Sequence, residues 1–320
     1  MLADPECPAC GNRNWSIIGE RIYRAEALSA RSPAASRILF KTWLPGTIEF
    51  RAKFGACRGC AFVTCLPRPS EDDIRKKYEQ GAQLGHYIPS KGEAPERTRR
   101  RARRLARIVT PHLTRSVDQS RILDFGGGDG RLLDELVSAG ASGDVVDYCR
   151  TPVPGVRHIG NTEEDLPRTA TYDAVICSHV VEHLAMPHSV LQRLRMVIRL
   201  GGILYVEVPV ELIKSMPAAR EPVTHCNFFI PESLATLLQR SGFRLLECKL
   251  TTYPHPGGGW SLCVAAIATP DEDVTASLSG IEALNRYLRP PLPFMARIQL
   301  MSWRTLPQRF YRKFRSRAGR

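Results

Sequence analysis

Apolar and polar positions along the chain predict strands that alternate with helices. Short apolar runs at residues 122–125, 174–177 and 203–208 are typical of strands that are buried on both faces. Apolar residues at helical spacing follow at 131–139 and at 190–200. This order predicts an α/β fold built on a doubly wound, Rossmann-like sheet.

The end of the predicted sheet differs from its centre. Gly201 and Gly202 are expected to end the helix at residues 190–200. Residues 245–250 and 260–268 then read as two strands that close the sheet as an antiparallel hairpin.

A glycine-rich turn follows the first strand of the sheet and leads into a helix. Backbone N–H groups and the positive end of the helix dipole can hold an anionic group at such a turn. The dinucleotide pattern G-x-G-x-x-G fails, because Arg131 occupies its last position. The run Asp124-x-Gly126-x-Gly128-x-Gly130 instead resembles motif I of the class I S-adenosylmethionine (SAM) methyltransferases. The turn alone also suits another Rossmann-type nucleotide site.

A second short strand, at residues 143–147, supports the SAM reading. It ends in Asp147, 23 residues after Asp124, where a carboxylate can bind the two hydroxyls of a ribose. The alternative is that Asp147 caps a loop. We expect the adjoining residues of both turns to line the cofactor, namely Asp124, Gly126, Gly127, Gly128, Gly130, Asp147 and Tyr148.

The stretch from Tyr172 to Leu184 resembles the fourth-strand motif of the same methyltransferases. The resemblance implies that Asp165 and Leu166 lie near the adenine and that Ser178 and His179 lie near the methionine part of SAM. Two catalytic candidates follow directly, Glu182 and His183. They could align the acceptor or accept a proton, or they could hold the following helix to the sheet.

His225 is the third catalytic candidate and lies in the loop after the fifth strand. In the sugar C-methyltransferases that the chain resembles, a histidine in a comparable loop serves as a base. The alternative for His225 is that it orders the loop.

Two C-x-x-C pairs predict a metal site. The chain has ten cysteines and no apparent signal peptide, so metal ligands or buried thiols are expected rather than disulfides. Cys7, Cys10, Cys57 and Cys60 can supply four thiolates to one structural Zn²⁺. The alternative is four ordinary reduced thiols. The segment between the pairs, which contains Trp43, is expected to form strands.

The residues after the second pair carry a further resemblance. Ser70 with Asp73 three positions later predicts the start of a helix. The run from Cys57 to Tyr78 resembles the N-terminal module of bacterial zinc-ribbon class I methyltransferases, many of which modify saccharides or natural products.

Positive charge is concentrated in two segments. Residues 97–107 hold seven arginines, which could contact phosphate but more simply form the solvated face of a helix. The formal net charge is +13, and residues 286–320 supply +10 of it without any Asp or Glu. The aromatic residues of this tail suit a helix on an anionic membrane, an RNA-binding arm, or a helix packed on the core.

These observations predict a SAM-dependent methyltransferase that acts on a small molecule or a saccharide precursor and contains a structural zinc ion. We expect a cytoplasmic protein whose tail contacts the inner face of the membrane. An RNA methyltransferase and a non-catalytic SAM-binding scaffold are the alternatives. The expected organisation is a zinc-ribbon-like module at 1–70, a helical linker at 71–118, the methyltransferase domain at 119–270, and a linker with a basic tail at 271–320.

Overall fold

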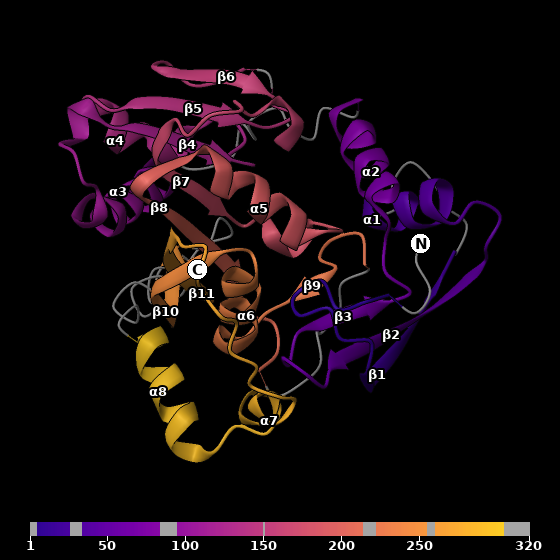
Figure 1. The fold of residues 1–320 in the computed structure, drawn as a ribbon. Coiled ribbons are helices and arrows are strands. Elements are labelled where there is room, and N and C mark those ends of the chain that lie inside the picture. The colour runs from indigo at the N-terminus through magenta and orange to yellow at the C-terminus, as the bar shows by residue number, and fades with distance from the viewer. Residues whose placement is uncertain are drawn as a thin grey trace, which may run out of the picture.

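The computed structural model describes residues 5–25, 34–83, 95–149, 151–213, 222–254 and 260–303, and these form two sheets with flanking helices (Figure 1). No helix in this described part is long and apolar enough to cross a membrane.

The larger sheet has seven strands in the order β10-β11-β8-β7-β4-β5-β6. The five strands from β8 to β6 are parallel, while β11 runs antiparallel to both β8 and β10. A parallel sheet with an antiparallel hairpin at one edge confirms the predicted fold class, a Rossmann-like α/β sheet. The strands are β4 (Arg121–Phe125), β5 (Ser142–Val146), β6 (Val156–Gly160), β7 (Tyr172–Ser178), β8 (Ile198–Pro209), β10 (Phe243–Pro254) and β11 (Trp260–Pro270).

Helices cover both faces of this sheet, because its strands are apolar on both sides. In β4, Ile122 packs with residues of α3 (Pro95–Val109) and α4 (Asp134–Ser138). Leu123 points the other way, toward α5 (Pro187–Val197) and α6 (Pro231–Arg240). Figure 1 shows the second pair of helices between the large sheet and the N-terminal part of the chain.

The smaller sheet joins the N-terminal segment to the part of the chain that forms the larger sheet. Its antiparallel strands are β1 (Trp15–Arg24), β2 (Glu49–Cys57), β3 (Val63–Leu66) and β9 (Asn227–Phe228). The last strand comes from the loop after β8, so Thr64 pairs with Asn227 across 163 positions of sequence. Phe62 also packs edge-on against Phe229 with ring centroids 5.3 Å apart. The two parts therefore share backbone pairing and core.

The helices of the N-terminal part differ in one respect from expectation. A short α1 (Ala34–Arg37) continues into a wide helical turn (Ile38–Trp43), so Trp43 does not lie in a strand. Its indole N–H donates to the carbonyl of Asp73, 2.7 Å away, in α2 (Glu71–Gln83). Packing against α2 thus decides the local conformation at Trp43.

The start of α2 agrees with the capping pattern. The Asp73 carboxylate accepts hydrogen bonds from the backbone N–H (2.8 Å) and the hydroxyl (2.7 Å) of Ser70. The Ser70 hydroxyl in turn accepts the N–H of Asp73 at 3.2 Å. Two otherwise unpaired donors are satisfied reciprocally, which fixes where the helix begins.

The end of α5 corrects a second expectation. The helix stops at Val197, before the two glycines, and Gly201 lies inside β8 with a φ of +76°. Ile198 already pairs with Tyr172, while the next pair along the ladder joins Ile203 to Ala174. Strand pairing therefore begins early, and the glycine accommodates an irregular stretch within the strand.

Two C-terminal helices, α7 (Glu282–Leu288) and α8 (Leu292–Trp303), follow the large sheet. Phe294 packs on Tyr287 with ring centroids 5.4 Å apart, and Ile298 is buried. The first turns of the predicted amphipathic tail thus pack on the body of the protein. Residues 304–320 lie outside the described part, as do residues 255–259 between the two strands of the hairpin.

Candidate active site

The glycine turn between β4 and α4 has the backbone that its sequence requires. Gly126, Gly128 and Gly130 have φ values of +69°, +63° and +77°, in the left-handed region that side chains disfavour. A Cβ on Gly127 would lie 2.2 Å from the Asp124 carboxyl group, whereas one on Gly128 would meet open space. A ligand can therefore approach the backbone closely at Gly128.

That open space is a cavity of about 830 Å³ at the carboxyl end of the parallel strands. Its volume lies within the usual range of ligand pockets, roughly 300–1,000 Å³. Eight of the predicted cofactor and catalytic residues line it, namely Gly126, Gly127, Gly128, Asp147, Tyr148, Ser178, His179 and His183.

Asp124 lies beneath the turn and is fully buried. Neither carboxylate oxygen has a hydrogen-bond partner among the described residues. Burial, reinforced by the neighbouring charge of Asp147, raises the pKa of Asp124 to about 7. A buried carboxylate without partners is costly, so this position suits a ligand that carries positive charge or hydrogen-bond donors.

Asp147 and Tyr148 form the next part of the wall. The Asp147 carboxylate accepts the N–H groups of Gly128 and Cys149, each at 2.9 Å, and so braces the two turns against each other. The Tyr148 ring stacks on Tyr78 of α2, with centroids 5.3 Å apart and planes within 1° of parallel. Helix α2 is thus a wall of the cavity, which the sequence pattern had not indicated.

Besides Asp124, three predicted cofactor residues do not line the cavity. Asp165 instead accepts the backbone N–H groups of Asn161 (2.7 Å) and Thr162 (3.1 Å), and thereby shapes the acidic loop. Its neighbours Glu163 and Glu164 line the cavity in its place. The remaining two are Gly130, which packs toward Val156, and Leu166, which is buried.

Arg101 is a cavity residue that sequence reasoning missed. It extends from α3 beside Ser178, and its guanidinium lies 5.9 Å from the Tyr253 ring centroid. Among the described residues it has no carboxylate partner, whereas Arg100 and Arg103 on the same helix pair with Glu96. Its position one helical turn before the buried Leu105 was the available signal.

The three catalytic candidates lie close together, and His183 among them lines the cavity. His183 and His225 lie edge to face with ring centroids 4.8 Å apart. The His183 Nδ1–H donates to the carbonyl of Thr224 at 2.6 Å, which leaves Nε2 with its lone pair. Burial, with the positive charges of Lys77 and His225 nearby, holds the pKa of His183 well below its usual range. His183 is therefore a neutral base at neutral pH.

His179 has the opposite character. Its Nδ1 lies 3.3 Å from a Glu182 oxygen and its Nε2 lies 3.5 Å from a Glu207 oxygen. Burial alone would lower the pKa of His179, but the two carboxylates raise it to about 9. Glu207 is held ionised against its burial by His179 and by Arg104, which lower its pKa to about 2. His179 is thus a fixed cation in the cavity wall.

The donor atoms of Glu182, His183 and His225 all lie within 4.8 Å of one another, a grouping that by composition could ligate a metal. Two positive charges face this group. One is the His179 imidazolium beside Glu182, and the other is Lys77, whose pKa burial lowers to about 8. Their repulsion of a cation favours proton transfer as the role of this cluster.

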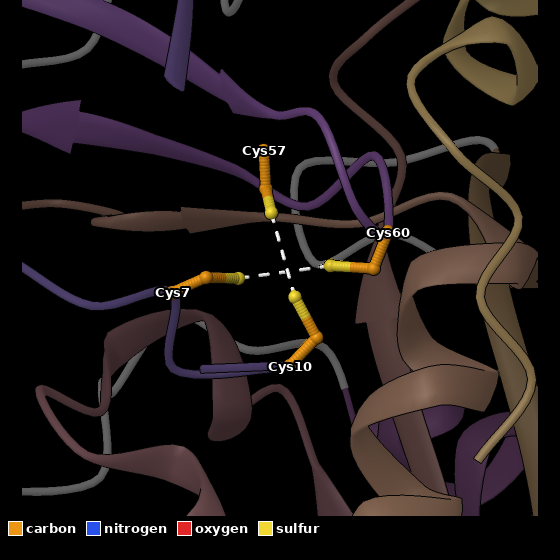
Figure 2. Close-up of side chains that lie close together, drawn as sticks. All are labelled: Cys7, Cys10, Cys57 and Cys60. Atoms are coloured by element: carbon orange, nitrogen blue, oxygen red, sulfur yellow. Dashed lines mark hydrogen bonds between the residues drawn. The ribbon is translucent and has the colours of Figure 1, made fainter. Parts of the chain in front are cut away.

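The four cysteines of the C-x-x-C pairs converge on one point (Figure 2). The Sγ atoms of Cys7 and Cys60 are 3.6 Å apart, and those of Cys10 and Cys57 are 3.4 Å apart. Tetrahedral Zn–S bonds of about 2.3 Å would place the sulfurs about 3.8 Å from each other. The donor set and its spacing therefore fit the predicted Zn²⁺.

Part of the chain is similar to a known protein family. Residues 97–248 match a protein family described as "Methyltransferase domain". No curated protein sequence matched the chain.

Solved structures with a similar fold include three methyltransferases. The 1,6-didemethyltoxoflavin-N1-methyltransferase of Burkholderia thailandensis is 19% identical, with a TM-score of 0.48 over 66% of this chain and 96% of that one. The glycopeptide N-methyltransferase MtfA is 16% identical, with a TM-score of 0.41 over 57% of this chain and 90% of that one. A protein of Listeria monocytogenes described as a "putative S-adenosylmethionine dependent methyltransferase" is 13% identical, with a TM-score of 0.40 over 51% of this chain and 96% of that one.

Proposed function

We propose that this chain, a methyltransferase by its domain at residues 97–248, transfers the methyl group of SAM to a small molecule or a saccharide or glycan precursor. The observation that carries the proposal is a cavity lined both by the glycine turn and by His183. The unpaired Asp124 carboxylate lies beneath that turn, and His183 is neutral at neutral pH.

The chain's own residues have separate tasks in this reaction. SAM supplies a methyl group on a positively charged sulfur, so the methyl needs no activation by the protein. The Gly128 backbone, Asp124 and Asp147 would hold the cofactor, and Arg101 would pair with the carboxylate of its methionine part. His179 and Tyr253, with rings 4.4 Å apart, would shape the space around the reacting groups.

His183 would act as the general base. Its Nε2 would take the proton from the acceptor's nucleophilic atom while the carbonyl of Thr224 keeps Nδ1 protonated. His225 is oriented in the same way, since its Nδ1–H donates to the Glu211 carboxylate at 2.7 Å. Glu182 would act through His179 and hold it in place.

We propose that Zn²⁺ at Cys7, Cys10, Cys57 and Cys60 has a structural role, because four thiolates close the coordination shell and leave no open position.

The basic tail is proposed to contact anionic membrane, since residues 304–320 contain seven Lys or Arg and no acid. Removal of these residues should abolish sedimentation with anionic vesicles and leave SAM affinity unchanged. Binding of the full chain to RNA but not to such vesicles would contradict the membrane contact.

Calorimetric and thermal-shift binding measurements test the cofactor. SAM and S-adenosylhomocysteine should bind and stabilise the protein by about 2.7 kcal/mol at a hundred times the dissociation constant. NAD should do neither. Gly128→Val should abolish binding, because its side chain would fill the open space above the turn. Stabilisation by NAD but not by SAM would overturn the proposal.

The acceptor can be sought by mass spectrometry of metabolites and glycan precursors from cells with and without the protein. With the acceptor in hand, His183→Gln should bind SAM normally and slow transfer by about 10²- to 10⁴-fold. Unchanged transfer by this variant would rule out His183 as the base.

A further inference from the structure

Arg68 is a buried cation between the N-terminal part and the candidate acceptor site. It lies between β3 and α2 and is only 2% exposed. One terminal nitrogen, Nη1, donates to the Thr64 hydroxyl and to Asn227 Oδ1, the latter at 2.9 Å. The other, Nη2, donates to the carbonyl of Ala185 at 2.7 Å.

The partners of Arg68 are unusual for a buried guanidinium. All three are neutral oxygens, and no carboxylate in the described part of the chain pairs with it. Burial lowers the pKa of Arg68, which reflects the cost of removing this charge from water. Apolar side chains often replace such buried charges without loss of stability. What an arginine adds is a planar fork that fixes several acceptors at once.

The segments that this fork holds are those that carry the catalytic candidates. Ala185 comes two residues after His183, and Asn227 comes two residues after His225. Asn227 continues the network, because its amide donates to the carbonyls of Val181 and Leu184, each at 2.8 Å.

Two more hydrogen bonds close the network around the same strand. The Thr64 hydroxyl, which receives one bond from Arg68, donates to the carbonyl of Cys226 at 2.8 Å. The N–H of Cys226 in turn donates to the carbonyl of Glu182 at 3.0 Å. The backbone on both sides of the His183–His225 ring contact is therefore tied to a side chain from the N-terminal part.

We propose that Arg68 is a positioning residue that sets the relative placement of His183 and His225. That this placement serves catalysis rests on the proposed function. The positions of the two histidines can be measured without any acceptor. It makes the cysteine-bearing N-terminal part a component of the acceptor site rather than a separate binding module.

The test uses the full chain without ligand and two conservative variants. Arg68→Lys keeps the charge but replaces the fork with one ammonium group, and Thr64→Val removes one hydroxyl at nearly constant shape. Histidine-selective NMR should show that the signals and pH titrations of His183 and His225 move in both variants. The signal and titration of His188, which is hydrogen-bonded to Ser241, should not change. The affinity for SAM, measured by calorimetry, should not change either.

Arg58→Lys is the matched control, because the exposed Arg58 side chain donates to the Ser16 hydroxyl within the N-terminal part. It should leave all histidine signals in place. If His183 and His225 keep their signals in Thr64→Val and Arg68→Lys while only stability falls, Arg68 merely braces the fold and the proposal is overturned. Failure of the parent protein to bind SAM would refute the proposed function instead, and the histidine signals would still decide the role of Arg68.

Discussion

At the scale of single residues, the cavity holds ionisable groups that burial drives to different states. Asp124 has no partner and its pKa rises to about 7, while His179 lies between two carboxylates and its pKa rises to about 9. Burial lowers the pKa of His183, and positive charge nearby lowers it further. Burial and neighbouring charges together, rather than residue type, therefore decide which group is charged at neutral pH.

The raised pKa of Asp124 predicts a pH-dependent affinity for SAM. The ionised carboxylate is the form that attracts a cationic ligand, and it predominates only above about pH 7. Calorimetry should show affinity rising as the pH increases through 7 and levelling off above it, with a limiting slope of about tenfold per pH unit below the pKa. Asp124→Asn should bind more weakly and lose this dependence. A parent affinity that stays constant from pH 6 to about pH 8 would contradict the assignment.

Arg101 permits a prediction that separates the two halves of the cofactor. Arg101→Met should weaken S-adenosylhomocysteine binding by about tenfold or more, since hydrogen bonds to charged groups contribute about 1.5–3 kcal/mol. Methylthioadenosine, which lacks the amino-acid part, should bind the variant as it binds the parent. Arg103→Met is the control, because Arg103 is exposed on the same helix and pairs with Glu96. Equal weakening of S-adenosylhomocysteine and methylthioadenosine binding would show that Arg101 does not contact the amino-acid part of the cofactor.

At the scale of elements, α2 does more than connect two parts of the chain. Its acidic first turn and the Ser70 cap hold its start, and Ile74, Arg75 and Tyr78 face the cavity. An element that begins as a simple capped helix thus becomes a wall of the cofactor site once the chain folds.

The contact between Tyr78 and Tyr148 yields the prediction for this helix. Tyr78→Ala should weaken SAM, S-adenosylhomocysteine and methylthioadenosine to a similar extent, because the lost wall borders the adenosine end. Aromatic pairs contribute about 0.5–1.5 kcal/mol, so the loss should be several-fold. Lys76→Ala, which removes an exposed ion pair with Asp72 in the same helix, should change none of the three affinities. If Tyr78→Ala binds all three ligands as tightly as the parent protein does, α2 does not contribute to cofactor binding.

At the scale of the whole molecule, the N-terminal and methyltransferase parts behave as one packed body. Cys57 and Phe62 belong to the same apolar core as Leu123 and Leu234, and β9 completes the small sheet. Loss of structure at the cysteines should therefore spread to the rest of the fold.

This arrangement predicts one zinc per chain and a single cooperative unfolding transition. Elemental analysis should find the metal, and Cys57→Ser should release it and lower the melting temperature of the entire protein. Cys65→Ser, a buried cysteine outside the four, is the control and should retain the zinc. Two separate transitions in calorimetry, with only the first shifted by Cys57→Ser, would show that the parts unfold independently.

Local sequence pattern by itself determined much of this protein. The alternation of apolar runs and helical spacing predicted the α/β sheet, including its antiparallel hairpin, and the structure confirms both. Glycine spacing predicted a tight turn, in which three glycines have left-handed φ values, and the Ser70 pattern predicted the start of α2. These features succeed because they depend on backbone conformation within a few residues. The proposed cofactor, metal and catalytic residues stay predictions.

Only the tertiary structure decided which charged residues matter. The local pattern places Arg101 one helical turn before Leu105 but does not show that it reaches the cavity. Nothing local shows that Arg68 is buried. The partner of Arg68 in β9, Asn227, lies 159 positions away along the chain. The burial of a charge depends on such distant contacts, because its desolvation is offset only by groups that folding brings to it. For the same reason, packing against α2 and pairing with β7 overrode the local patterns at Trp43 and Gly201.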